Sequence, residues 1–161
     1  MYIEWRFNDE AKGISLEEFE RDYEDFFGYM MIKLGDYQLG WAEKSSPIDE
    51  GDENISYYII SLIKCGITLL LGQEFKVQLI SSNLLEIHVY SDMGVYIDVI
   101  RIDSNEILCS YNITFIDLKD EIMKNYQKYI DEIQRTNRDL IEASVVKNTM
   151  KYYDIFTRLL D

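Results

Sequence analysis

Four short runs of β-forming residues lie between positions 74 and 115, and the connections between them are very short. The runs are Glu74–Ile80, Leu84–Tyr90, Val95–Ile102 and Ile107–Phe115, with three or four mostly polar residues between each and the next. Connections of this length can join only antiparallel neighbours, because a parallel crossover needs a dozen or more residues. The sequence therefore predicts a four-stranded antiparallel meander.

Apolar and polar residues alternate along these runs, so the two faces of the meander can be assigned. The face expected in the core carries Phe75, Val77, Leu79, Leu85, Ile87, Val89, Val95, Ile97 and Val99. The more polar face carries Lys76, Gln78, Glu86, His88, Tyr90, Tyr96 and Asp98.

Helical spacing of apolar residues predicts helices on both sides of the meander. Residues 16–27 form an expected amphipathic helix, and Ser15 and Glu18 have the spacing of a capping box at its start. Ile55–Leu71 repeats apolar residues at intervals of three and four and ends at Gly72, which predicts a buried helix. Two more helices are expected, over residues 118–133 and from about residue 139 or 144 to 160, with a break at Thr136–Asn137.

The N-terminal region adds strands. Tyr2–Asn8 alternates like a strand, and Tyr29–Leu34 and Gln38–Glu43 flank a turn in a predicted hairpin.

The chain has 161 residues, 47% of them hydrophobic, which fits a single domain over residues 1–161. We expect an α+β fold, an antiparallel β-sheet built from the meander plus the N-terminal hairpin, with helices packed on one face. The sequence does not decide whether the hairpin joins the meander or packs separately.

Cysteine content and hydropathy indicate a cytoplasmic protein. Cys65 and Cys109 each lie in an apolar stretch, as reduced cysteines do, and the N-terminus lacks the pattern of a signal peptide. The longest apolar run, Ile67–Leu71, is far shorter than the about 20 residues that span a membrane, so we expect no membrane partner.

The formal net charge of −14 argues against direct binding of nucleic acid, whose phosphates it repels, and favours a basic protein partner. Residues 1–54 hold 15 acidic and 5 basic side chains, so most of the excess lies there. An anionic surface with aromatic anchors suits a protein interface, and Tyr37 and Trp41 lie at or beside a turn. The candidate partner-binding residues are Glu17, Glu18, Glu20, Asp22, Glu24, Asp25, Asp36, Tyr37, Trp41, Asp49, Glu50, Asp52 and Glu53.

The sequence carries no catalytic signature, and we expect neither an enzyme, a cofactor nor a metal site. His88 is the only histidine, and it could pair with Asp98 as a general base in one register of the 84–102 hairpin. No GxSxG, P-loop, GxGxxG or HExxH motif occurs. The acidic run 49–53 lacks the ligand spacing of a calcium loop.

The stretch from Gly28 to Arg101 resembles several families of immunity proteins from bacterial polymorphic toxin systems. The resembling elements are the hairpin that begins Gly-Tyr-Met-Met-Ile-Lys-Leu-Gly-Asp (28–36), the acidic loop 49–53, the apolar helix 55–71 and the meander 74–102. The resemblance implies a small acidic cytosolic inhibitor that binds a secreted toxin, often a basic nuclease, and covers its active site or an exosite.

Other functions remain open at this point. The acidic residues could imitate nucleic-acid phosphates and engage a basic DNA-binding protein, which competition with duplex DNA would reveal. A small enzyme would need His88, so its replacement tests that alternative. The helix 55–71 is apolar on nearly every side, which suits a central core position or the seam of a homodimer in an oligomerising domain.

Overall fold

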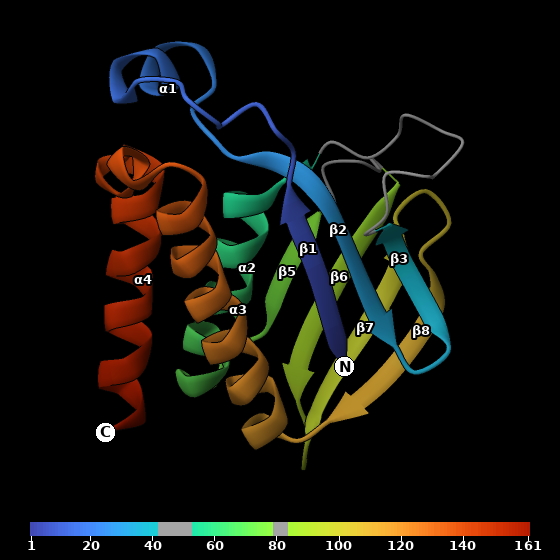
Figure 1. Ribbon diagram of the computed structural model, residues 1–161. Helices are drawn as coiled ribbons and strands as arrows, with labels where there is room; N and C mark the ends of the chain where they lie inside the picture. The colour runs from blue at the N-terminus through green and yellow to red at the C-terminus, as the bar shows by residue number, and fades with distance from the viewer. Residues whose placement is uncertain (42–52, 79–83) are drawn as a thin grey trace.

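The meander forms as the sequence predicts. The computed structural model describes residues 1–41, 53–78 and 84–161 (Figure 1). Its strands β5 (Phe75–Gln78), β6 (Leu85–Ser91), β7 (Val95–Arg101) and β8 (Glu106–Ile113) pair antiparallel in that order. The expected core face is confirmed at Ile87, Val89, Val95, Ile97 and Val99, which are all buried. Leu79 lies outside the described residues.

The N-terminal strands form a separate antiparallel sheet. Strand β2 (Phe27–Leu34) lies between β1 (Tyr2–Phe7) and β3 (Tyr37–Trp41), and β4 (Glu53–Asn54) pairs with its beginning. A Cβ at Gly28 would lie 2.0 Å from the Arg6 carbonyl oxygen, so this close pairing of β1 and β2 requires glycine. The open question of the sheet order is thus answered by two four-stranded sheets.

The helices are α1 (Leu16–Asp22), α2 (Ile55–Leu70), α3 (Phe115–Thr136) and α4 (Ser144–Leu160), with a 3₁₀ turn η1 (Arg138–Glu142) between the last two. Thr114 caps α3 by accepting the Asp117 N–H at 3.1 Å, and Gly72 ends α2 with a left-handed φ of +70°. The helices α2, α3 and α4 lie to one side of the sheets (Figure 1), which confirms an α+β fold.

Helix α2 occupies the centre of the molecule because nearly all of its surface is apolar. Ile55, Ile59 and Ile63 are fully buried. Gly66 lets α2 approach both other long helices, since a Cβ there would lie 2.6 Å from the Phe156 ring and 2.7 Å from Ile122. These contacts favour the core position over a dimer seam for this helix.

The prediction of a helix over residues 16–27 is wrong for the second half of that range. Helix α1 ends at Asp22, Glu24 has a left-handed φ of 60°, and β2 already begins at Phe27. Phe26 instead packs its ring against Phe19 and Phe7, with centroids 4.7 Å away in each case. Burial of this aromatic cluster outweighs the helical spacing of the sequence.

Within the described residues, no helix is both long and apolar enough to cross a membrane.

Candidate functional site

The candidate surface is centred on α1 and the turn that follows it, which together carry six of the eleven acidic residues predicted to bind a partner. Ser15 begins the helix, and its Oγ accepts the Glu18 N–H at 3.1 Å, as the capping-box spacing predicts. Helix α1 lies above the N-terminal ends of α2 and α4 (Figure 1). A helix N-terminus carries a partial positive charge and unpaired N–H groups, so it attracts carboxylates.

Asp25, which follows α1, caps the N-terminus of α2. Its Oδ1 accepts the backbone N–H of Ser56 at 3.1 Å and that of Phe26 at 2.6 Å, while the Phe26 carbonyl accepts the Ile55 N–H at 2.8 Å. Asn54, in the N-cap position of α2, makes no capping bond with its own side chain. Burial raises the pKa of Asp25 above its usual value, and the hydrogen bonds at α2 oppose that rise.

Glu20 caps the N-terminus of α4 in the same way. Its Oε1 accepts the backbone N–H of Ser144 at 2.5 Å, and Ala143, the N-cap residue, has no side chain that could do so. Two of the six carboxylates over residues 17–25 therefore hold the fold together. This assignment explains part of the charge asymmetry of the sequence without a partner, because Glu20 and Asp25 are engaged within the fold.

The remaining acidic residues of this region face solvent. Glu17, Asp22 and Glu24 are exposed and Glu18 is half-buried. Asp22 forms an ion pair with Arg21 at 2.7 Å. Among the described side chains, no lysine or arginine forms an ion pair with Glu17, Glu18 or Glu24.

The other predicted contact residues do not lie beside α1. Asp36 is exposed and Tyr37 half-buried, and both lie at the β2–β3 turn, at the end of β2 remote from α1 (Figure 1). The length of β2 separates the two places by roughly 20 Å at about 3.3 Å per residue. Glu53 is 6% exposed and pairs with Gly28, so it offers no contact surface. Asp49, Glu50, Asp52 and the side chain of Trp41 lie outside the described part of the structure.

The polar face of the meander brings His88 and Asp98 together in the register that a general base would need. His88 Nε2 lies 3.0 Å from a Glu74 carboxylate oxygen, and its ring packs against Tyr90 with centroids 5.1 Å apart. Asp98 is only 5% exposed and accepts a hydrogen bond from Ser110 Oγ at 2.6 Å. Partial burial and the Asp98 carboxylate raise the pKa of the Tyr90 hydroxyl.

The two cysteines, which both lie in the described part of the chain, are not activated as nucleophiles. Burial raises the pKa of Cys65 to about 12, so that thiol stays protonated at neutral pH. Burial, with a contribution from Asp98, also raises the pKa of Cys109. The face is consequently a partly buried polar network on a sheet, whose members satisfy one another.

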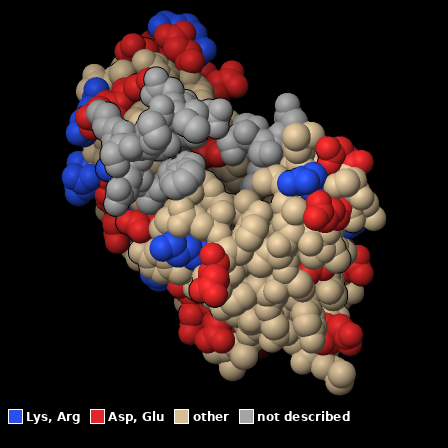
Figure 2. Space-filling model, turned by 90° about the vertical axis from the view of Figure 1, so that its right-hand side faces the viewer, with Lys and Arg blue, Asp and Glu red and all other residues tan. Residues whose placement is uncertain are grey.

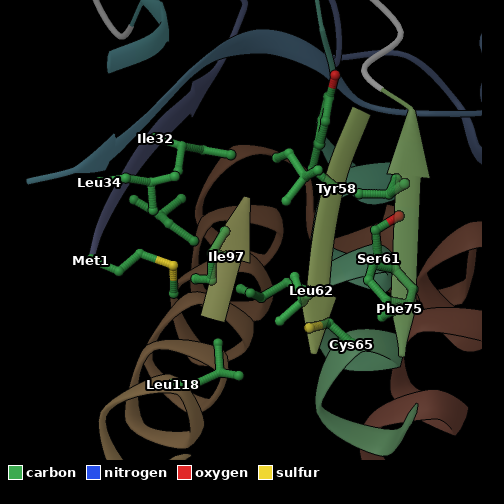
Figure 3. Close-up of a pocket in the computed structure, with 14 residues that line it drawn as sticks. Met1, Ile32, Leu34, Tyr58, Ser61, Leu62, Cys65, Phe75, Ile97 and Leu118 are labelled. Carbon is green, nitrogen blue, oxygen red and sulfur yellow. The ribbon is translucent and has the colours of Figure 1, made fainter. Parts of the chain in front are cut away.

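An apolar cavity of about 70 Å³ lies between the two sheets (Figure 3). Ile32 and Leu34 line it from the first sheet, Leu62 and Cys65 from α2, and Ile97 from the second sheet. A second cavity of about 400 Å³ lies where β8 meets α3 and is polar. Neither cavity is lined by His88 or Asp98.

Comparison with known proteins adds no relative: no family model, curated protein or solved structure matches the chain. Among the described residues, no group of three or more histidine, cysteine or acidic side chains could hold a metal ion. Sequence reasoning had no means to find the capping roles of Glu20 and Asp25, because both partners are distant in the sequence.

Proposed function

We propose that this chain is a protein-binding inhibitor, an immunity protein that neutralises a basic bacterial toxin in the cytoplasm. The observation that carries the proposal is the set of acidic side chains on and after α1 that form no ion pair with the described bases, namely Glu17, Glu18 and Glu24. Unpaired like charges on one surface repel one another, and a cationic partner relieves that repulsion. The same field speeds the encounter with such a partner.

Burial raises the pKa of both cysteine thiols, so neither is an activated nucleophile, and this favours binding over catalysis. An inhibitor needs only a stable surface, and the caps made by Glu20 and Asp25 fix α1 onto two helix ends. The acidic surface is thus held rigidly, which lowers the entropy lost on association. A free cysteine in the core, Cys65, accords with a reducing compartment.

The test is capture of a basic protein by the purified chain, first from a lysate and then as a purified pair whose association rate is measured. A triple variant, Glu17→Gln, Glu18→Gln and Glu24→Gln, removes three charges from the α1 surface. The matched control, Asp92→Asn, Asp131→Asn and Asp161→Asn, removes three exposed charges elsewhere.

We expect the α1 variant to associate at least about tenfold more slowly at low salt, and to lose much of its salt dependence. The control variant should associate nearly as fast as the parent chain. Equal association rates for the two variants would remove the α1 surface from the interface. Failure to retain any basic protein, with the chain folded, would overturn the inhibitor function itself.

A further inference from the structure

Strand β8 ends the second sheet, and its outer edge is open among the described residues. It pairs only with β7 there, so alternate residues direct their backbone N–H and C=O groups away from the sheet. It is also one of the two longest strands, with eight residues. An open edge of this length is a template for one more strand.

The other strand edges have features that discourage pairing. On β1, Lys128 Nζ donates a hydrogen bond to the Trp5 carbonyl, and its ammonium lies 4.2 Å from the Trp5 ring centroid. Strand β5 has four residues, with Lys76 among them, and β3 contains Gly40 with a left-handed φ of +69°. Charges, short length and irregular backbone are the usual protections of an edge.

Strand β8 has almost none of these protections. After Glu106, its residues Ile107–Ile113 contain no charged side chain and no proline. Its one irregularity is a register shift opposite Val99 and Ile100, near its beginning. Ile107 is 57% exposed, and Ser110 and Asn112 are exposed as well. Figure 2 views the side of the molecule on which β3 and β8 lie in Figure 1, and it shows a broad surface with few charged side chains.

Acidic side chains lie at both ends of this uncharged edge. Asp103 and Glu106 precede or begin β8, and Arg101 pairs with Glu106 at 3.2 Å. At the other end, the polar cavity of about 400 Å³ is lined by Met1 and Tyr111–Thr114 together with Asp117, Asp120 and Glu121. The Met1 ammonium donates a hydrogen bond to the Tyr111 hydroxyl at 2.8 Å, and Lys119 and Lys124 form ion pairs with Asp120 and Glu121. Asp117 is therefore the carboxylate of this group that has no ion pair among the described residues. Because Tyr111–Thr114 at the end of β8 line the cavity, a strand added along this edge would end beside it.

We infer that the edge of β8 accepts an extended, largely uncharged segment of a basic protein as an added strand, with a lysine or arginine at the end that lies beside Asp117. The identity of that protein as the neutralised toxin rests on the proposed function. Backbone hydrogen bonds supply the affinity in this mode of recognition, and the terminal base supplies the specificity.

Charge complementarity selects a basic partner over a second copy of this chain. Each copy carries a formal net charge of −14. Antiparallel pairing of β8 with itself would place Asp103 and Glu106 of one strand towards Asp117 of the other. Like charges opposed in this way cost free energy, whereas a basic segment gains it.

The test uses synthetic peptides and amide hydrogen exchange on the full chain, followed residue by residue by NMR. The probe is Lys-Thr-Val-Thr-Val-Thr-Val-Lys at about 1 mM, a concentration that reveals even weak binding. A peptide with glutamate in place of both lysines tests the charge requirement, and one with proline in place of the central valine tests backbone pairing. The outward amides of β8 are identified as the fast-exchanging ones in the free chain.

We expect the lysine-flanked peptide to slow exchange at alternate amides of Ile107–Ile113 at least about tenfold, because pairing buries them. The glutamate and proline peptides should leave these amides nearly unchanged. Unchanged β8 amides with the lysine-flanked peptide would overturn the inference. The inference would also be overturned if the dilute chain had the mass of a dimer and its β8 amides were already protected, because a second copy would then fill the edge.

A pair of variants separates the edge from the general acidity of the chain. Asn112→Lys places a charge on the exposed edge beside the cavity, and Met93→Lys makes the same change of charge at a fully exposed turn residue. We expect Asn112→Lys alone to weaken the peptide by about tenfold. Equal affinities for the two variants would contradict the inference. Capture of a basic protein that leaves β8 unprotected would overturn the edge and keep the inhibitor function, whereas peptide binding without capture would do the reverse.

Discussion

The carboxylate of Asp25 accepts the backbone N–H of Ser56 at 3.1 Å, and this bond joins the turn after α1 to the first turn of α2. We predict that Asp25→Ala lowers the free energy of unfolding by about 1–2 kcal/mol, the usual cost of a lost helix cap. Asp25→Asn should cost less, because its amide oxygen can still accept the bond. Urea denaturation of both variants checks the order; an asparagine variant as unstable as the alanine one would contradict the capping role.

The pH dependence of Asp25 follows from its raised pKa. Burial makes the folded state bind this proton more tightly than the unfolded state, whose pKa is close to 3.8. The contribution of Asp25 to stability is therefore fully present below pH 3.8 and is lost as the pH rises through the folded-state pKa. Measured against Asp25→Asn, the parent chain should lose relative stability as the pH rises above about 4 and then level off. A difference that moves in the opposite direction would mean that the helix end, not burial, dominates.

Gly66 sets the distance between α2 and the two C-terminal helices. Gly66→Ala would place a Cβ 2.6 Å from the Phe156 ring and 2.7 Å from Ile122, so we predict a loss of about 1–3 kcal/mol from overpacking. Ile122→Val removes one of the two clashing atoms and should restore part of the loss in the double variant. Additive effects in a double-mutant cycle, measured by thermal unfolding, would show that the two residues do not interact.

The apolar cavity between the sheets should accept one more methyl group. Val89 lines it, so Val89→Ile is expected to raise the free energy of unfolding by about 0.8 kcal/mol. Val99 is equally apolar and fully buried but does not line the cavity. The matched change Val99→Ile should instead cost about 1–3 kcal/mol. Calorimetry on the two variants checks the opposite signs, and a loss in both would mean that the cavity is closed in solution.

A buried hydrogen bond connects the first sheet to α3. The Trp5 indole N–H donates to Asn125 Oδ1 at 2.9 Å, and both side chains are 1% exposed. Asn125→Ala leaves the indole N–H without its partner, so we predict a loss of about 1–3 kcal/mol. Denaturation monitored by tryptophan fluorescence measures it. Gln127→Ala, at an exposed position on the same helix, is the control and should change stability by less than about 0.5 kcal/mol.

The local elements could be predicted from the sequence where pattern and burial agree. The alternation through Val95, Ile97 and Val99 and the three-and-four spacing of Ile55, Ile59 and Ile63 both reflect faces that the structure buries. The spacing predicts a helix that is too long after Tyr23, because Phe26 continues the helical spacing of α1 but packs in the aromatic cluster of the core. Spacing alone cannot distinguish these two outcomes.

The arrangement of the surface could not be predicted, because it depends on contacts between distant residues. Acidic composition indicates an anionic surface, but it does not reveal that Glu20 and Asp25 belong to helix ends that begin at Ser144 and Ile55. In the same way, the sequence predicts a strand over residues 107–115, but the position of this strand at an edge depends on the sheet order.

The bond between Glu20 and Ser144 spans most of the chain, and this has a consequence for protein synthesis. The ribosome makes Glu20 124 residues before Ser144, so this carboxylate exists long before the helix end that it caps. Until Ser144 is made, the Glu20 carboxylate has no N–H group of α4 to bind, whereas Asp25 can cap α2 once Ser56 has been made. The acidic segment is thus fixed in place in two stages, first at Asp25 and later at Glu20.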